Sequence, residues 1–302
     1  MAEIVGIGSA LFDTLMQIDG FPQEDTKMQG GAAKLQGGGP CATALCAAAR
    51  LGVSAAYMGT LGDDMYGEYI RAGLQRCGVD TSRVRAVKGA VSYHSFVLLN
   101  TRRATRTCVW SKGTLPEAGP DDIDPAFLRQ AKFLHLDGHQ LSAARRAAQL
   151  ARECGVAVSL DAGGRYPGIE TLLPLVDILI PSEEFALGIT GCAAAEDAAA
   201  KLWQQYHPRT LIVTQGSRGG FLYTPQGPCR YPVYPVQAVD TNGAGDTFHG
   251  AFLAGRCRGM TDAQAADWAS AVSALKCTRF GAQDGIPTAA EAEAFRQSRR
   301  TQ

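Results

Sequence analysis

The chain has 302 residues, of which 46% are hydrophobic, and its 29 basic and 29 acidic residues give a formal net charge of zero. This length and hydrophobic content allow a sizeable core, and one large α/β layer structure with a small appendage fits them as well as two domains. The balanced charge excludes a strong electrostatic preference for nucleic acid or an anionic membrane. No apolar run reaches the length of a membrane span, and the N-terminus has no basic leader, so we expect a cytoplasmic protein.

The nine cysteines are scattered through apolar runs without paired metal spacing. We expect them to be reduced and mostly buried, as small hydrophobic residues.

The first part of the chain combines one buried strand with two turn-rich β segments. Residues 4–7 form an apolar run that is typical of a buried parallel strand, and Asp13 follows soon after it. Ligands of open α/β sheets gather beyond the carboxyl ends of strands, so Asp13 is placed to accept hydrogen bonds from the hydroxyl groups of a ligand, or else is a loop or capping residue. Residues 15–36 and 92–111 contain short segments with alternating residue patterns, interrupted by turn residues. This predicts two groups of short β-strands that leave the main sheet and pair with each other.

The middle of the chain predicts a parallel sheet. Gly37 to Gly39 expose backbone that a polyol can touch, and a helix rich in small residues follows them. Later segments alternate between strand and helix patterns, which indicates a sheet with helices on both faces. The expected strands are 54–59, 133–136, 156–160, 178–180 and 210–214, and the expected helices are 40–51, 63–77, 142–154, 182–189 and 262–277.

The stretch from Asp240 to Phe252 is a turn of small residues that runs into an apolar helix, expected to end near Gly255. Gly243, Ala244 and Gly245 let a ligand approach the backbone, and the free N–H groups of the helix start attract phosphate. A carboxylate fits such a site if it takes a proton from a hydroxyl while the N–H groups hold a phosphoryl group. The pattern therefore predicts phosphoryl transfer to an alcohol with Asp246 as the base, and a plain helix start is the alternative.

Two motifs carry a family resemblance: Gly37-Gly-Gly-Pro-Cys-Ala-Thr-Ala44, and Asp240-Thr-Asn-Gly-Ala-Gly-Asp-Thr-Phe-His-Gly-Ala251. Together they resemble the signatures of the ribokinase-like carbohydrate kinase family, with most likeness to ketohexokinase and sulfofructose kinase-type members. The resemblance implies a three-layer α/β/α sandwich with a central, mostly parallel sheet and a small β-sheet lid. It implies a single kinase domain over 1–302, a lid formed by 15–36 and 92–111, and a homodimer through that lid.

The resemblance also implies binding roles for individual residues. The implied sugar ligands are Asp13, Asp25, Gly38, Gly39, Thr43 and Asp137, and the implied nucleotide contacts are Arg106, Ser182, Thr214, Gly216, Gly219 and Gly245. Thr43 stands where the family usually has Asn. In the family's Asn-x-x-Glu motif, Ser182 replaces the Asn and Phe185 the Glu, which leaves Glu184 as the expected Mg²⁺ ligand.

The resemblance further implies a monovalent cation loop that contains Asp240 and Gly281. Asn242 departs from the commoner Thr in this loop, so the sequence leaves a potassium requirement open. The expected cofactors are therefore ATP and Mg²⁺, with K⁺ undecided.

We predict an ATP-dependent kinase that phosphorylates a primary hydroxyl of a small sugar, with a neutral ketohexose in furanose form as the first candidate. Neither nucleic acid nor a membrane is an expected partner. One alternative is a nucleoside kinase, for which Phe12, Tyr93 and Phe96 offer an aromatic platform. The other is a non-catalytic sugar sensor, for which the altered Asn-x-x-Glu motif leaves room.

Overall fold

The computed structural model describes residues 1–103 and 105–300. In this part of the chain, nine strands form one main sheet: β1 (Ile4–Ile7), β4 (Ala55–Gly62), β5 (Asp80–Val87), β8 (Phe133–Leu136), β9 (Ala157–Ala162), β10 (Ile178–Pro181), β11 (Thr210–Thr214), β12 (Gly220–Thr224) and β13 (Gly227–Tyr231). Their order is β13-β12-β11-β10-β9-β8-β1-β4-β5. All pairs from β5 to β11 are parallel, and β12 and β13 add an antiparallel edge. The predicted mostly parallel sheet is confirmed.

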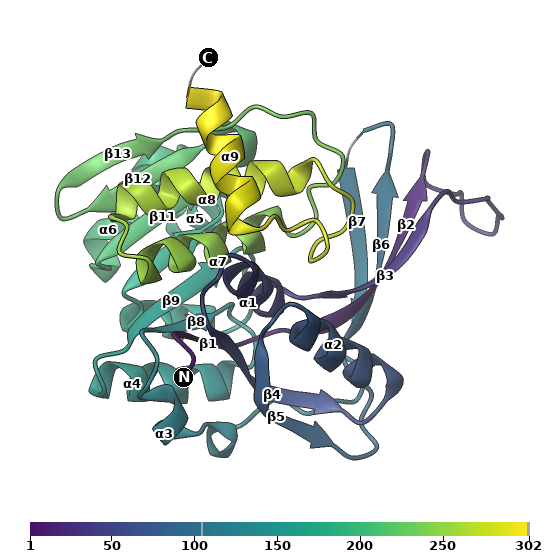
Figure 1. The fold of residues 1–302 in the computed structure, drawn as a ribbon, viewed down its shortest axis with the longest axis horizontal. Coiled ribbons are helices and arrows are strands. Elements are labelled where there is room, and N and C mark those ends of the chain that lie inside the picture. The colour runs from purple at the N-terminus through teal and green to yellow at the C-terminus, as the bar shows by residue number, and fades with distance from the viewer. Residues whose placement is uncertain (104, 301–302) are drawn as a thin grey trace.

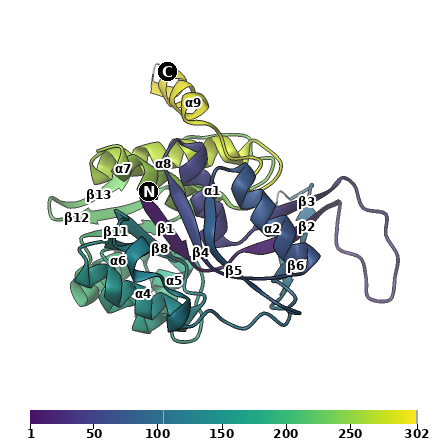
Figure 2. The ribbon, with the colours of Figure 1, turned by 60° about the horizontal axis from the view of Figure 1, so that its bottom comes forward.

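Helices cover both faces of this sheet (Figures 1 and 2). One face carries α1 (Pro40–Arg50), α2 (Met65–Arg76), α7 (Ala244–Cys257) and α8 (Asp262–Cys277), and the other carries α3 (Pro125–Leu128), α4 (Leu141–Glu153), α5 (Glu183–Thr190) and α6 (Ala195–Tyr206). A last helix, α9 (Ala289–Arg300), packs against α8. Side chains of β1 alternate between two apolar cores, because Ile4 packs on one side and Val5 on the other. The three-layer sandwich is therefore confirmed.

Four more strands form a separate small sheet beside the main one (Figure 1). They are β2 (Leu11–Ile18), β3 (Ala33–Gly38), β6 (His94–Asn100) and β7 (Thr105–Ser111), in the order β3-β2-β6-β7. The two predicted groups of short β-strands therefore do pair, through a parallel contact between β2 and β6. The first of them begins earlier than expected, so Asp13 lies within the small sheet rather than in a loop after β1.

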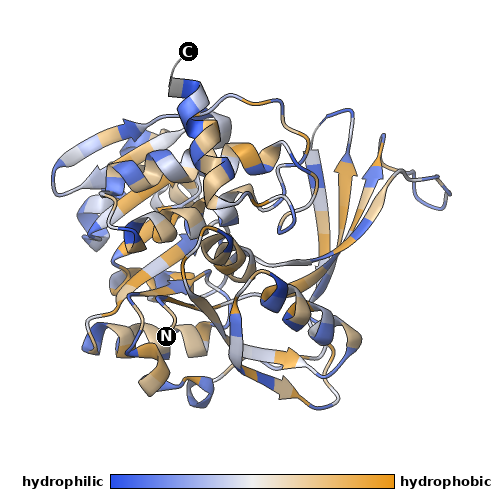
Figure 3. Ribbon diagram, in the orientation of Figure 1, coloured by the Kyte–Doolittle hydropathy of each residue, from blue (hydrophilic) through white to orange (hydrophobic). Residues whose placement is uncertain are grey.

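Hydrophobic residues follow the strands of the small sheet as well as the core of the sandwich (Figure 3). Leu15, Val97 and Leu99 form a small cluster on the inner face of this sheet. The outer face leaves Met16, Leu35, Phe96 and Val109 exposed. Helix α2 covers the Phe12 end of this face, and these four side chains mark the part that the described residues leave uncovered.

Helices α1 and α7 pack with their backbones almost in contact. A Cβ added at Gly250 would lie 2.0 Å from the carbonyl oxygen of Ala44, so only glycine fits there. Small residues on both helices thus allow the close approach that the sequence of residues 40–51 predicted. The consequence is that the N-termini of α1 and α7 reach the same cavity.

Two sequence expectations need correction or addition. Only Cys41 and Cys46 are buried, whereas Cys108 and Cys229 are exposed, so the expectation of mostly buried cysteines is wrong. Strand β5 and helices α3, α6 and α9 had no counterpart among the expected elements. Among the described residues, no helix combines the length and the apolar character that crossing a bilayer requires.

Candidate active site

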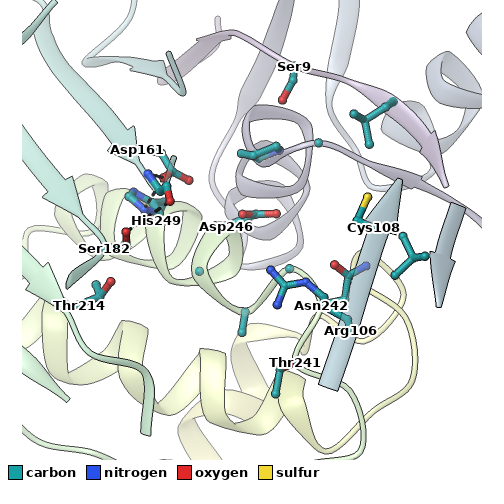
Figure 4. A pocket seen from close by; sticks show the side chains of 18 of the residues that line it. Ser9, Arg106, Cys108, Asp161, Ser182, Thr214, Thr241, Asn242, Asp246 and His249 are labelled. Carbon is teal, nitrogen blue, oxygen red and sulfur yellow. Dashed lines mark hydrogen bonds and ion pairs between the residues drawn. The ribbon is translucent and has the colours of Figure 1, made fainter. Parts of the chain in front are cut away.

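A cavity of about 670 Å³ lies between the main sheet and the small sheet (Figure 4). It is lined by residues from the ends of main-sheet strands, by the start of α7 and by strands β2 and β7. The predicted residues that line it are Asp13, Gly39, Arg106, Ser182, Glu184, Thr214, Gly216, Gly243, Ala244, Gly245 and Asp246. Seven other predicted residues do not line it: Asp25, Gly38, Thr43, Asp137, Gly219, Asp240 and Gly281.

The start of α7 presents unpaired backbone N–H groups to this cavity. Gly243 is the N-cap with φ 73°, a conformation that favours glycine. Ala244 donates its N–H to the carbonyl of Thr241 at 3.2 Å. Among the described residues, none accepts a hydrogen bond from the N–H of Gly245 or Asp246. A Cβ at Gly245 would meet nothing within 4 Å, so the space above the helix end is open to a ligand. This geometry suits a phosphate group.

The Asp246 side chain lies in the first turn of α7 and points into the cavity (Figure 4). Burial raises its pKa to about 7, and the nearby charge of Asp161 acts in the same direction. The charges of His249 and Arg106 oppose this shift in the pKa of Asp246. A carboxyl with a pKa near neutral pH is suited to take a proton and later release it.

Asp13 is another carboxyl at this cavity, and it is buried. Its Oδ1 accepts a hydrogen bond from Ser95 Oγ at 2.5 Å, and burial raises its pKa to about 6. A Cβ at Gly38 would lie 2.1 Å from the Asp13 carboxylate, so this glycine makes room for the carboxylate and does not face the cavity itself. At Gly39, φ is 97° and a Cβ would meet the carbonyl of Ser9 at 2.6 Å, so the backbone there also requires glycine.

Asp137 has a different role from the expected sugar ligand. It is buried, and its Oδ2 accepts hydrogen bonds from the N–H and Oγ of Ser9 at 2.8 and 2.6 Å and from the N–H of Cys41 at 3.0 Å. Its Oδ1 accepts the N–H of His139 at 3.0 Å. The carboxylate therefore ties the loop after β1 to the start of α1, and its oxygens are engaged within the chain.

Two further expected sugar ligands also lie outside the cavity lining. Asp25 is exposed and belongs to the connection between β2 and β3, a segment that extends away from the sandwich in Figure 1. Within one chain it therefore does not join Asp13. Thr43 is fully buried inside α1, and its Oγ1 has no hydrogen-bond partner among the described residues. Its methyl group lies behind Gly243, where an added Cβ would meet it at 3.4 Å.

Arg106 belongs to the small sheet but extends toward Asp246 and Asn242 (Figure 4). Strand β7 pairs with β6 so that Arg106 stands opposite Leu99, on the inner face. This position places a guanidinium, the side chain best suited to phosphate, at the edge of the cavity that faces the α7 helix end.

The opposite end of the cavity is formed by strand ends of the main sheet. Ser182 caps α5 by accepting the N–H of Phe185 at 3.1 Å, and a β-bridge joins it to Thr214. Gly216 lines the cavity beside Thr214. Gly219 does not line the cavity. With φ 80° and the carbonyl of Tyr231 only 3.1 Å from an added Cβ, it shapes the turn into β12 instead.

The expected magnesium ligand fits its role in part. Glu184 lines the cavity, and no described residue forms a hydrogen bond or ion pair with it. The adjacent Glu183 is instead engaged by Gln215 at 2.9 Å and by Arg218. Among the described residues there is no cluster of three His, Cys, Asp or Glu side chains that would hold a metal alone. One free carboxylate suits Mg²⁺, because this ion keeps several water ligands and is also coordinated by the oxygens of substrate phosphates.

The loop of Asp240 and Gly281 does not fit a bound monovalent cation. The two carboxylate oxygens of Asp240 accept the N–H groups of Asn242 and Gly281, at 2.8 and 2.9 Å. The carbonyl of Asp240 accepts a hydrogen bond from Lys276 Nζ at 2.9 Å, and Lys276 also donates to the carbonyl of Asn242. The oxygens that would hold an ion are therefore engaged by the chain's own groups.

Asp161 and His249, to which no motif had assigned a role, complete this part of the cavity. Asp161 Oδ1 lies 3.3 Å from His249 Nε2, close to Asp246 (Figure 4). Burial alone would raise the pKa of Asp161, but the facing His249 holds it below its usual value. Asp161 comes directly after the expected strand 156–160, and Asp13 was expected to lie beyond the strand 4–7. The position of an acidic residue after the carboxyl end of a strand would therefore have identified Asp161.

The expected aromatic platform is not assembled as predicted. Phe12 is buried against Tyr66 and Tyr69, and Phe96 is exposed on the outer face of the small sheet, so only Tyr93 lines the cavity. A different aromatic group takes its place. Trp110, His139 and Tyr166 line the cavity. The centroid of the His139 ring lies 4.1 Å from that of Tyr166, with the rings tilted by 44°, and 6.5 Å from that of Trp110, with the rings nearly perpendicular.

Known proteins share this architecture. The pfkB family carbohydrate kinase profile matches residues 1–289. The chain is 30% identical over 302 residues to an ATP-dependent ribose-1-phosphate kinase of Halopiger xanaduensis, covering 99% of both chains.

Two solved structures superpose on nearly the whole chain. A putative ribokinase from Agrobacterium tumefaciens has a TM-score of 0.91 at 27% identity, over 99% of this chain and 98% of the other. A putative ribokinase II from E. coli, in complex with ATP and Mg²⁺, has a TM-score of 0.87 at 25% identity, over 99% and 100%. The sequence and structural matches agree, and the chain belongs to the pfkB family of carbohydrate kinases.

Proposed function

We propose that the chain transfers the γ-phosphoryl group of ATP to a primary hydroxyl of a small sugar in furanose form, with a neutral ketohexose as the first candidate. The observation that carries this proposal is the position of Asp246. Its carboxyl faces the cavity directly beside the unpaired N–H groups at the start of α7. A base and a phosphate-binding helix end thus share one wall, which is what phosphoryl transfer to an alcohol requires.

Asp246 is the general base of the proposed reaction. Its carboxylate takes the hydroxyl proton as the sugar oxygen bonds to the γ-phosphorus, and the bond to the β–γ bridging oxygen breaks and leaves ADP with the electron pair. The N–H groups of Gly245 and Asp246 stabilise the charge on the transferred group. Asp13 accepts hydrogen bonds from sugar hydroxyls and orients the sugar, since it is buried and held by Ser95.

Two further side chains serve the phosphates. Arg106 extends from β7 toward the helix end and supplies a positive charge there. Glu184 would hold Mg²⁺, and the bound ion would neutralise charge on the phosphate oxygens. The similarity to a putative ribokinase II structure that contains ATP and Mg²⁺ supports ATP and Mg²⁺ as the cofactors.

A nucleoside kinase is the second candidate, and one observation favours it. The rings of Trp110, His139 and Tyr166 cluster at the cavity wall. Aromatic faces of this kind stack on a nucleobase, although they also pack on the apolar face of a sugar.

The test is an ADP-release assay of the purified chain against a panel of ketohexoses, pentoses, sugar phosphates and nucleosides. We expect turnover with at least one furanose sugar, and turnover confined to nucleosides would select the second candidate. Sugar binding by calorimetry without turnover of any panel member would contradict the proposed catalysis.

We also propose that the outer face of the small sheet forms a homodimer contact. Phe96 stands opposite Val109 in the β6–β7 register and opposite Thr14 in the β2–β6 register, and both apolar side chains are more than half exposed. Burying such a face is favourable. Light scattering should show a dimer for the wild type and a monomer for Phe96→Asp. A monomeric wild type at micromolar concentration would contradict this contact.

A further inference from the structure

Lys276 is a fully buried lysine in the last turn of α8. An ammonium group loses its hydration when it is buried, and this loss is costly unless polar partners replace the water. The partners of Lys276 are backbone carbonyl oxygens. Its Nζ donates to the carbonyl of Asp240 at 2.9 Å and to the carbonyl of Asn242.

Both carbonyls belong to the turn that directly precedes the N-cap of α7. The carboxylate of Asp240 holds the same turn by accepting N–H groups from Asn242 and Gly281. The carbonyl of Cys277 adds a third tie by accepting the N–H groups of Val239 and Asp240, at 2.8 and 3.1 Å. The Lys276 ammonium therefore lies at the centre of the contacts that fix where α7 begins.

Carbonyl oxygens that converge on one compact positive charge are what a potassium ion also requires. Here an ammonium fixed to α8 supplies that charge from within the chain. The negative charge of Asp240 stabilises the ammonium, while burial acts in the opposite direction and lowers the pKa of Lys276. The Lys276 ammonium thus occupies the position of a cation in this loop. The carbonyl oxygens of Asp240 and Asn242 are bound to it and are not free to coordinate a metal ion.

We propose that Lys276 is a positioning residue that acts as a built-in monovalent cation: it holds the 240–242 turn, and thereby the phosphate-binding start of α7, so that the enzyme works without potassium. The proposal rests on the phosphoryl transfer proposed above. It assigns to Lys276 no contact with the substrate, because its ammonium lies behind the turn and does not line the cavity.

The first test uses the wild-type enzyme and needs no variant. Sugar turnover and the thermal midpoint are measured in potassium, sodium and choline chloride at equal ionic strength, with the sugar that the panel identifies. We expect equal kcat and equal midpoints in all three salts. A requirement for potassium, or a midpoint raised by potassium alone, would overturn the proposal.

The second test removes the charge and supplies it again from solution. Lys276→Met keeps the length of the side chain, and we expect its kcat in choline chloride to fall by about 10²-fold, with a smaller change in KM, since the displaced N–H groups act mainly in the transition state. Potassium or ammonium chloride should restore kcat by about tenfold or more, because either ion can occupy the vacated position. A folded variant that keeps full activity in choline, or that neither ion rescues, contradicts the proposal.

Lys201→Met is the matched control. Lys201 Nζ also donates to a backbone carbonyl, that of Thr190 at 2.7 Å, but on α6, on the opposite face of the sheet. We expect no salt-dependent change in its kcat.

If Lys276→Met does not fold, the comparison of the wild type in the three salts still decides between the outcomes. If the wild type turns over no sugar in any salt, the proposed function fails, and the thermal midpoints of the wild type and Lys276→Met in potassium and choline decide the role of Lys276 alone.

Discussion

The two walls of the cavity differ in how firmly they are held. On the main-sheet wall, Asp246 sits on α7, whose residues from Thr247 to Gly255 are all buried between neighbouring helices. On the small-sheet wall, Arg106 and Trp110 belong to β7, every residue of which is exposed. Elements with few buried contacts open at lower free energy. We infer that the proposed base, Asp246, is fixed in a rigid wall, and that the positive charge of Arg106 comes from a wall that can move over the substrate.

The largest effect is expected on the rigid wall. Asp246→Asn removes the base, so kcat should fall by about 10³-fold while the fold and nucleotide binding are kept. Turnover is measured by ADP release and nucleotide binding by calorimetry. Asp197→Asn, in the exposed first turn of α6 on the opposite face of the sheet, is the control and should leave kcat unchanged. Near wild-type turnover in Asp246→Asn would remove this residue from the role of base.

A smaller effect is expected on the exposed wall. Arg106→Met keeps the side-chain length but removes the charge that extends toward the helix end, so kcat should fall by about tenfold to a hundredfold. Arg103→Met, in the exposed turn between β6 and β7, is the matched control. Equal kcat values for the two variants would show that the small-sheet wall contributes no charge to the reaction.

The two walls should also differ in how a glycine-to-alanine substitution changes the free energy of unfolding. Gly250→Ala places a Cβ 2.0 Å from the Ala44 carbonyl and should lower the free energy of unfolding by about 1–3 kcal/mol. Gly20→Ala, in the small-sheet loop, has nothing within 4 Å of the added Cβ and should change little. Urea unfolding measures both. A loss in Gly20→Ala as large as that in Gly250→Ala would contradict the difference in packing.

The smallest effect is a pH-dependent change in thermal midpoint. Because the pKa of Asp246 is raised from 3.8 to about 7 in the fold, the folded chain retains a proton that the unfolded chain releases. The carboxyl therefore destabilises the fold increasingly as pH rises between these values. Asp246→Asn should raise the midpoint relative to wild type at pH 8 and much less at pH 4. A pH-independent difference would mean that the carboxyl is not desolvated.

The sequence predicted the architecture well because the strand and helix patterns of a layered α/β fold are local. The phosphate-binding character of the start of α7 was also predictable, because Gly243 and Gly245 have no side chain that could block the backbone from a ligand. The partners of buried polar groups were not predictable, because they depend on elements distant in sequence. Asp137 was expected at the sugar, but it is engaged by Ser9 and Cys41. Lys276 gave no signal beyond an ordinary position in a helix.

The most direct test is a crystal structure with a non-hydrolysable ATP analogue and the sugar that the panel identifies. The account predicts that a primary hydroxyl lies within about 2.6–3.2 Å of the Asp246 carboxylate, with the γ-phosphate on the N–H groups of Gly245 and Asp246. A bound sugar whose hydroxyls all lie beyond hydrogen-bonding reach of Asp246, with both ligands in place, would contradict it.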